Sequence, residues 1–433
     1  MPPHPETWLR VTPLGLHCEP GGFTIDPVRP VDRAVITHGH ADHARPGHGA
    51  VLATPETLAI MRARMGEAGA GAVQQPILPG EVLRQGGVEI RLLPAGHVLG
   101  SAQVVLDWQG SRVVVSGDYK RQRDPTCAPF EVVPGRGGGL GGCDVFVTEA
   151  TFALPVFRHP PPEAEVAKLL KSLALFPERT HVVGCYALGK CQRLIRLLRE
   201  AGWEAPIHLH GALAPLCRLY EALGVPLGPL APATVAAKAA LRGAIVLAPP
   251  SAIQDRWARR LAEPVVGLAS GWMRVRQRAR TRGVELPLVI SDHADWDDLN
   301  RTIDEVGAPE VWVTHGRDDA LVHALALRGI RGRALHLIGL GEEEDDPPPG
   351  ADQGDDAAAT AAGHEAGDDV ANRGEATTAA AHGVGGAAVR RGGTEHAAVR
   401  RGENEHAAAN RGEAATAAVR GVGGAAANRG ENI

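Results

Sequence analysis

Six consecutive residues near the start of the chain place three imidazoles and one carboxylate in a single short segment, His38-Gly39-His40-Ala41-Asp42-His43. Imidazole nitrogens and carboxylate oxygens are suitable ligands for Zn²⁺ or Mn²⁺. Side chains alternate along an extended loop, so we expect His38 and His40 to point one way, while Asp42 and His43 reach a second centre. The segment therefore predicts a site for divalent metal ions.

More imidazole and carboxylate side chains follow apolar runs farther along the chain. Taken singly, a histidine after a strand is more often structural than a ligand. Here the placement repeats five times, and ligands in α/β proteins gather at the carboxyl ends of strands, so we expect one shared site. The five residues are His97, Asp118, Glu149, His293 and His315, which follow expected strands at residues 88–93, 112–116, 144–148, 286–290 and 311–314.

The elements that must position these residues alternate along the chain from about residue 12 to residue 340. Short β-branched runs are interleaved with helical patterns, which indicates a layered α/β protein. The turn chemistry of Trp108-Gln109-Gly110-Ser111 favours a hairpin between two strands. Further strands are expected at residues 33–37, 103–107, 181–184, 244–248 and 334–338, and helices at residues 56–65, 163–175, 188–201 and 253–261.

Residues 341–433 differ from the rest of the chain in composition. They contain 17 acidic and 8 basic side chains, whereas residues 1–340 contain 33 and 37. They also lack Leu, Phe, Trp, Tyr and Met, and their only Ile is Ile433. Because so little apolar surface cannot offset the entropy lost on ordering, we expect a disordered, low-complexity tail.

Several classes of protein are not expected. No stretch approaches the roughly 18 apolar residues of a transmembrane helix, and the start of the chain lacks the pattern of a signal peptide. The six cysteines show neither a CxxC pair nor the spacing of a disulfide framework, which is typical of thiols in a reducing compartment. We therefore expect a cytoplasmic protein.

The order of these motifs resembles that of a known family. The block at residues 38–43, with the later histidine, aspartate and glutamate segments, is similar to metallo-β-lactamase-fold nucleases of the β-CASP group, above all to the bacterial DNA ligase-associated exonuclease (mRNA 3′-end-processing-factor-like) family. The resemblance covers about residues 10–340. It implies an α/β fold, a four-layered αβ/βα sandwich at residues 1–160 and 286–340, with a β-CASP cap inserted at residues 161–285 and the tail at 341–433.

The same resemblance implies which residues hold two divalent metal ions, Zn²⁺ first and Mn²⁺ as the alternative. His38, His40 and His97 would hold one ion. Asp42, His43 and His315 would hold the other, and Asp118 would bridge the two. Asp26, in Thr24-Ile25-Asp26-Pro27, matches a position where an aspartate supports the histidine loop. The alternative for Asp26 is a turn residue before proline.

Two neighbouring metal ions can activate a shared hydroxide for in-line attack on a phosphodiester. By resemblance, His293 would give a proton to the leaving alkoxide, Glu149 would orient His293, and Asp118 would be catalytic through its bridging role. The implied activity is a DNA exonuclease of repair and ligation, with a DNA ligase or helicase as an associated protein. RNA processing is the alternative. RNA-processing members usually carry histidine at the position of His315, but so does the ligase-associated family, so this residue leaves both open.

A nucleic-acid substrate should meet basic side chains. Residues 272–282 contain five arginines, and further basic residues follow Asp118. A solvated basic helix is the alternative for the arginine run. The expected phosphate contacts are Lys120, Arg121, Arg274, Arg276 and Arg278.

A near match to a nucleotide-binding loop, GxxxxGK[ST], spans residues 184–191. Cys191 replaces the hydroxyl residue that would hold Mg²⁺, so an ATP site is not expected, and Lys190 is instead a candidate for binding a substrate phosphate.

Two other classes of function stay open. A small-ester or thioester hydrolase would carry a short cap or none, and a non-catalytic scaffold would have lost metal ligands.

Overall fold

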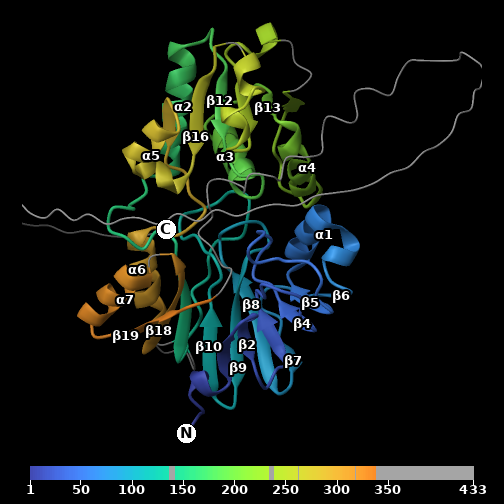
Figure 1. Cartoon of the computed structure of the whole chain (residues 1–433), viewed down its shortest axis with the longest axis vertical. Helices are drawn as coiled ribbons and strands as arrows, with labels where there is room; N and C mark the ends of the chain where they lie inside the picture. Colours follow the sequence, from blue (N-terminus) through green and yellow to red (C-terminus); the bar gives the residue numbers. More distant parts are fainter. Residues whose placement is uncertain (136–141, 234–237, 262, 317, 338–433) are drawn as a thin grey trace, which may run out of the picture. The chain divides into compact units, whose positions relative to one another are not determined.

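The structure is a computed structural model that describes residues 1–135, 142–233, 238–261, 263–316 and 318–337. The predicted disordered tail at residues 341–433 lies outside this range. The described strands form three sheets (Figure 1).

The first sheet has six strands in chain order and is covered by one helix. Helix α1 (Pro55–Gly69) begins after Thr54, whose hydroxyl accepts the Thr57 N–H at 3.2 Å, as an N-cap residue should. Leu58 and Met61 of this helix pack with Ile36 against the outer face of the sheet. The strands are β1 (Leu9–Thr12), β2 (Gly15–Cys18), β3 (Phe23–Ile25), β4 (Arg33–Val35), β5 (Ala50–Ala53) and β6 (Val73–Pro76).

The second sheet has seven strands in the order β19-β18-β11-β10-β9-β8-β7. The predicted hairpin at Trp108-Gln109-Gly110-Ser111 is confirmed, because Ser111 pairs with Trp108 across the turn. Gln109 and Gly110 have φ values of 48° and 84°, as a tight hairpin turn requires. The strands are β7 (Leu83–Gln85), β8 (Val88–Pro94), β9 (Ala102–Trp108), β10 (Ser111–Val115), β11 (Val145–Ala150), β18 (Glu310–Gly316) and β19 (Arg331–Leu335).

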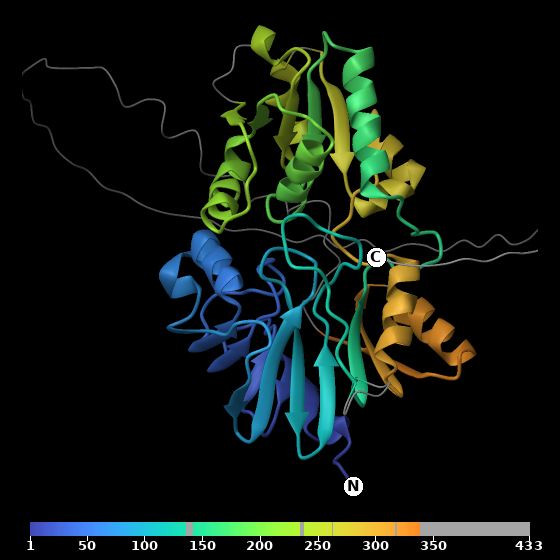
Figure 2. The same cartoon turned by 180° about the vertical axis from the view of Figure 1, so that it is seen from behind.

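The two sheets pack face to face and carry helices on their outer faces. Between them lies a core that joins Phe23 and Ile25 of the first sheet to Leu92 and Val113 of the second. On the outer face of the second sheet lie α6 (Trp296–Val306) and α7 (Asp318–Leu327), orange in Figures 1 and 2. The order helix, sheet, sheet, helix confirms the predicted four-layered αβ/βα sandwich.

The third sheet is built from chain inserted between β11 and β18. Its six strands, in the order β14-β13-β15-β12-β16-β17, are all parallel. Its strand β17 ends at Leu288, three residues beyond the expected boundary at 285. The strands are β12 (His181–Gly184), β13 (Ile207–Leu209), β14 (Leu230–Pro232), β15 (Ile245–Ala248), β16 (Val265–Ala269) and β17 (Leu286–Leu288), and the helices are α2 (Pro162–Leu175), α3 (Lys190–Glu200), α4 (Ala214–Ala222) and α5 (Arg276–Thr281).

Alternate residues of the third sheet enter two different cores. Val183 and Leu247 pack with α2, α3 and α4 on one face, whereas Val182 and Val246 pack with α5 and neighbouring turns on the other. This alternation is what a sheet covered on both faces requires. The inserted chain therefore has its own layered α/β architecture.

One expected helix was wrong. In place of a helix over residues 253–261, the structure has two short 3₁₀ turns, Ala252–Gln254 and Ala258–Arg260. Asp255 between them is extended (ψ 168°), and its carboxylate accepts the N–H of Arg256 at 3.0 Å. A local side-chain hydrogen bond of this kind competes with helical hydrogen bonding.

None of the helices in the described residues is both long and apolar enough to span a membrane.

Candidate metal centre and its neighbouring residues

The expected site residues meet at one edge of the two central sheets. The histidine block follows β4, His97 follows β8, Asp118 follows β10, and Glu149 lies near the end of β11. Strands β8, β10 and β11 run in the same direction, so their carboxyl ends share an edge. The structure also brings His293 to this edge, although it follows β17 of the third sheet.

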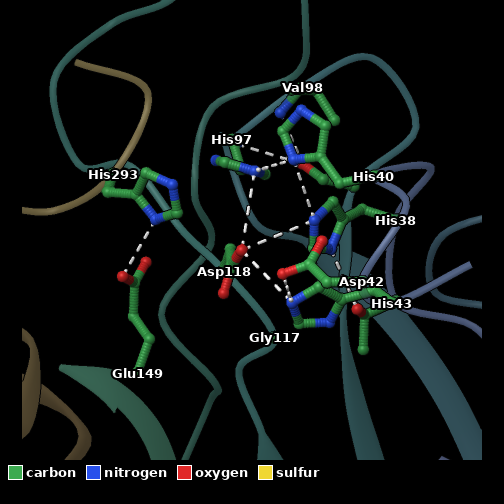
Figure 3. Close-up of polar contacts among 12 residues, drawn as sticks. His38, His40, Asp42, His43, His97, Val98, Gly117, Asp118, Glu149 and His293 are labelled. Atoms are coloured by element: carbon green, nitrogen blue, oxygen red, sulfur yellow. Dashed lines mark hydrogen bonds and ion pairs between the residues drawn. The ribbon is translucent and has the colours of Figure 1, made fainter. Parts of the chain in front are cut away.

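His38, His40, His97 and Asp118 form a buried cluster in which each offers one ligand atom within 4.8 Å of the others. His40 Nδ1 lies 3.1 Å from His38 Nε2 and 3.0 Å from His97 Nε2. Asp118 Oδ2 lies 3.5 Å from His38 Nε2 and 3.8 Å from His97 Nε2 (Figure 3). Three imidazoles and a carboxylate converging in this way are a donor set that fits a divalent metal ion.

A second group of ligand atoms, from His43 and Asp42, also lies close to Asp118. His43 Nε2 is 3.3 Å from Asp118 Oδ2 and 3.6 Å from Asp42 Oδ2. The same oxygen of Asp118 thus faces both groups, the position that a bridging ligand would occupy. The backbone of His315 belongs to β18, but its side chain lies outside the described part, so its role as a ligand stays a prediction.

Asp26 supports the histidine block through three hydrogen bonds. One carboxylate oxygen accepts the Thr37 N–H at 2.8 Å, and the other accepts the Thr37 hydroxyl at 2.6 Å. The latter oxygen also lies 2.8 Å from His43 Nδ1, so it accepts that N–H. Asp26 itself has a φ of 43°, a conformation that aspartate tolerates better than most residues. These contacts go beyond the alternative of a turn residue before proline.

The three clustered histidines and His43 each have an oxygen next to the ring nitrogen that faces away from the cluster. Besides His43 with Asp26, His38 Nδ1 lies 3.1 Å from the Thr37 hydroxyl, His97 Nδ1 lies 2.9 Å from the Asp292 carbonyl, and His40 Nε2 lies 3.4 Å from the Leu188 carbonyl. An N–H donated outward leaves the other ring nitrogen to accept a metal. Sequence reasoning missed Thr37, Leu188 and Asp292. Two of these acceptors are backbone carbonyls, which carry no sequence signal.

Burial and charge set the protonation of the cluster. Burial, together with the neighbouring histidines, lowers the pKa of His97 to about 4 and that of His38 well below its usual value. Burial also acts to lower the pKa of His43, but the carboxylates of Asp118, Asp42 and Asp26 outweigh it and raise that pKa well above its usual value. Because ligation needs a deprotonated nitrogen, a metal ion would replace the proton on His43.

His293 and Glu149 form a buried pair beside the cluster. His293 Nδ1 lies 3.0 Å from Glu149 Oε2 (Figure 3). The other carboxylate oxygen accepts the Tyr119 N–H at 2.7 Å. The His293 ring centroid is 4.6 Å from that of His97. His293 also belongs to two further groups of possible ligands, one with Asp118 and Glu149 and one with His97 and Asp292.

Three of the basic residues expected to contact phosphate have partners within the protein. Lys120 Nζ donates to the His293 carbonyl at 2.9 Å, Lys190 Nζ lies 3.2 Å from Asp292 Oδ1, and Arg121 bonds to the side chains of Thr302 and Glu305. The Lys120 and Lys190 side chains are buried, so the structure gives both amines internal contacts. Their contact with a nucleic acid stays a prediction.

The three arginines expected to contact phosphate in the run after Trp272 lie at the surface. Arg274, Arg276 and Arg278 are exposed, and the Arg278 guanidinium lies 4.0 Å from the centroid of the Trp272 ring. Trp272 is buried against Phe152 and Phe157, so it packs within the protein. These arginines therefore offer exposed positive charge, and their contact with phosphate also stays a prediction.

Comparison with known proteins agrees with this architecture. Residues 24–180 match the metallo-beta-lactamase superfamily, a span that includes the histidine block, His97, Asp118 and Glu149. The chain contains a metallo-β-lactamase domain.

The relatives of the chain include proteins named for DNA and for RNA chemistry. It is 28% identical over 330 residues to a "Probable DNA ligase" of Opitutus terrae, which covers 74% of this chain and 30% of that protein. It is 33% identical over 139 residues to "Endoribonuclease ysh1" of Aspergillus fumigatus, covering 30% and 15%. It is 29% identical over 140 residues to "Cleavage and polyadenylation specificity factor subunit 3" of Dictyostelium discoideum, covering 30% and 17%. The chain thus spans less than a third of the length of each of these relatives.

Proposed function

We propose that this protein is a metal-dependent nuclease of the β-CASP type, and that it acts as a DNA exonuclease. The observation that carries the proposal is the buried cluster of His38, His40, His97 and Asp118 next to the His293–Glu149 pair. The superfamily match and the relatives named as endoribonucleases support a hydrolase. The inserted α/β unit corresponds in this proposal to the β-CASP cap.

In this proposal, two divalent ions, Zn²⁺ or Mn²⁺, occupy the centre. His38, His40 and His97 would hold one ion, Asp42, His43 and His315 would hold the other, and Asp118, which faces both groups, would be shared by the two. Asp26 keeps His43 oriented. Metal ions held there would lower the pKa of a bound water and neutralise charge on the phosphate oxygens. The four histidines are held with one nitrogen toward the centre, so little reorganisation is needed on binding.

His293 is the proposed proton donor to the leaving oxygen. Glu149 accepts the Nδ1–H of His293 and is itself fixed by the Tyr119 N–H. This arrangement orients the ring and stabilises its protonated form, which can give up the Nε2 proton to an alkoxide. Lys120, bonded to the His293 carbonyl, holds the backbone at the same place.

The proposed substrate is DNA, and RNA is the second candidate. The relative named "Probable DNA ligase" aligns with 74% of this chain, whereas relatives named as the endoribonuclease ysh1 align with 30% to 44% of it. The observation that favours RNA is that several relatives are named as endoribonucleases. The exposed arginines Arg274, Arg276 and Arg278 would contact either backbone. A DNA ligase or helicase is the proposed associated protein, and the cytoplasm the proposed location.

The test is a cleavage time course with the full chain, stripped of metal and reloaded with Zn²⁺ or Mn²⁺. End-labelled single-stranded DNA, duplex DNA and RNA of one sequence are compared, with Asp118→Ala as the blank. Products that shorten from one DNA end support the proposal and give the polarity. Preferential RNA cleavage supports the second candidate, and absence of metal-dependent cleavage of all three contradicts both.

A further inference from the structure

Two of the three clustered histidines are oriented by oxygens that lie outside the four-layered sandwich. His40 Nε2 faces the carbonyl of Leu188, in the turn between β12 and α3 of the inserted unit. His97 Nδ1 faces the carbonyl of Asp292, in the segment that follows β17. The inserted unit and the segment leaving it therefore touch the metal centre at two of its proposed ligands.

Lys190 ties these two contacts together. Its Nζ lies 3.2 Å from Asp292 Oδ1, and the two side chains are 3% and 1% exposed. Its backbone N–H donates to the same Leu188 carbonyl, at 3.0 Å. One residue of α3 thus holds both the carbonyl that meets His40 and the side chain of the residue whose carbonyl meets His97.

The turn that carries Lys190 is packed tightly against the centre. Gly189 has a φ of 80°, and a Cβ at this position would lie 2.3 Å from a side-chain carbon of Val98, the neighbour of His97. The backbone that carries Lys190 is therefore closely packed against the residue next to His97. Since a buried ammonium and a buried carboxylate need each other, removing either charge leaves the other uncompensated.

We propose that Lys190 is a positioning residue of the metal centre: by holding Asp292 it fixes the carbonyl that orients His97, so that the inserted unit completes the centre of the metallo-β-lactamase domain. This inference rests on the proposed function, because it assumes that the cluster binds metal. It replaces a direct phosphate contact as the role of Lys190.

A second buried ion pair, formed by another residue of α3, supplies a matched control. Arg193, one turn after Lys190, lies 3.7 Å from Asp124 Oδ2, and both side chains are 1% exposed. Asp124 also accepts the N–H and the hydroxyl of Thr126. The contacts of this pair are thus with each other and with Thr126. Breaking this pair should disturb the packing of α3 without releasing His97.

The experiment compares Lys190→Met, Lys190→Arg and Arg193→Met with the unaltered full chain. Zn²⁺ affinity is measured by competition with a chromophoric chelator, the Co²⁺ visible spectrum reports ligand geometry, and the melting temperature of the metal-free protein reports folding. We expect Lys190→Met to weaken Zn²⁺ binding by about 10- to 100-fold and to change the Co²⁺ spectrum. Lys190→Arg should recover most of the affinity, and Arg193→Met should lower the melting temperature while binding Zn²⁺ within about threefold of the unaltered chain.

A double variant keeps the inference testable where Lys190→Met alone does not fold. Lys190→Met with Asp292→Asn leaves no unpaired buried charge, so it should regain the melting temperature but not the Zn²⁺ affinity. Unchanged Zn²⁺ affinity in Lys190→Met, recovery of affinity in the double variant, or equal loss in Arg193→Met would overturn the inference. So would loss of one bound Zn²⁺ in Asp292→Asn alone, because the carboxylate would then be a ligand.

The outcomes for the inference and for the proposed function are separate. A chain that loses Zn²⁺ affinity through Lys190→Met but cleaves no nucleic acid keeps the inference and contradicts the proposed function. If the chain cleaves DNA but its Lys190→Met variant binds Zn²⁺ normally, the proposed function is kept and the inference about Lys190 is contradicted.

Discussion

Replacing Asp26 by asparagine should weaken metal binding without removing any proposed ligand. The carboxylate of Asp26 accepts three hydrogen bonds, two from Thr37 and one from His43. In Asp26→Asn the amide oxygen can still accept the Thr37 N–H. The amide NH₂ then replaces the oxygen that faces His43 Nδ1 and the Thr37 hydroxyl. The hydroxyl can turn and accept from it, but the N–H of His43 then faces another donor.

The structure gives the direction and size of the effect. With an NH₂ beside it, His43 Nδ1 becomes an acceptor, and the ring proton moves to Nε2, the nitrogen that lies 3.3 Å from Asp118 Oδ2. A protonated Nε2 cannot bind a metal. Loss of such an orienting partner costs about 10- to 100-fold in affinity, or about 1.4–2.8 kcal/mol.

The assay is a Zn²⁺ competition titration that resolves the two binding steps. Asp26→Gly is the matched control, because glycine accepts the φ of 43° and removes the carboxylate without adding a donor. We expect Asp26→Asn to weaken one of the two steps and to weaken it more than Asp26→Gly does. Two Zn²⁺ ions bound by Asp26→Asn with unaltered affinity would refute the reasoning.

Three further predictions concern the ligands, the proton donor and acid stability. Asp118→Ala should lose both metal ions and all cleavage, since this side chain faces both ligand groups; metal analysis showing one ion retained would contradict a bridging role. His293→Ala should cut turnover by about 10²- to 10⁴-fold with metal content near normal, and a metal loss equal to that of Asp118→Ala would instead make His293 a ligand. Burial, with Lys120 and His293 nearby, holds the pKa of His159 well below its usual 6.5, so protonation favours the unfolded chain and stability falls as the pH drops below about 6.5. At pH 5.5 the loss in the free energy of unfolding is about 1.4 kcal/mol. The melting temperature of His159→Phe should therefore fall less between pH 7.5 and 5.5 than that of the unaltered chain.

Much of the site could be predicted from the sequence because its residues follow apolar runs. The histidine block, His97, Asp118 and Glu149 each stand next to a strand of the two central sheets. Strand β8 shows why this works, since its alternating burial matches the alternating apolar pattern of its residues. The direction of the strands then brings their ends together.

The rest could not be predicted, for identifiable physical reasons. Strands β1 to β3 and β5 to β7 have only three or four residues each, too few for a periodic pattern to stand out. The pairing of Lys190 with Asp292 joins residues far apart in the sequence. The burial of Lys120 and Lys190 depends on that folding, so their charge alone favoured a surface contact with phosphate. The orienting carbonyls of Leu188 and Asp292 belong to the backbone, whose position no residue type encodes.

The most direct test of the central claim is one titration followed in two ways. Zn²⁺ is added stepwise to the metal-free full chain, and bound metal and cleavage of end-labelled DNA are measured in the same samples. We expect two ions per chain, with cleavage appearing only as they bind. Cleavage by the metal-free chain, or a chain that binds no Zn²⁺ at any concentration, would contradict the account.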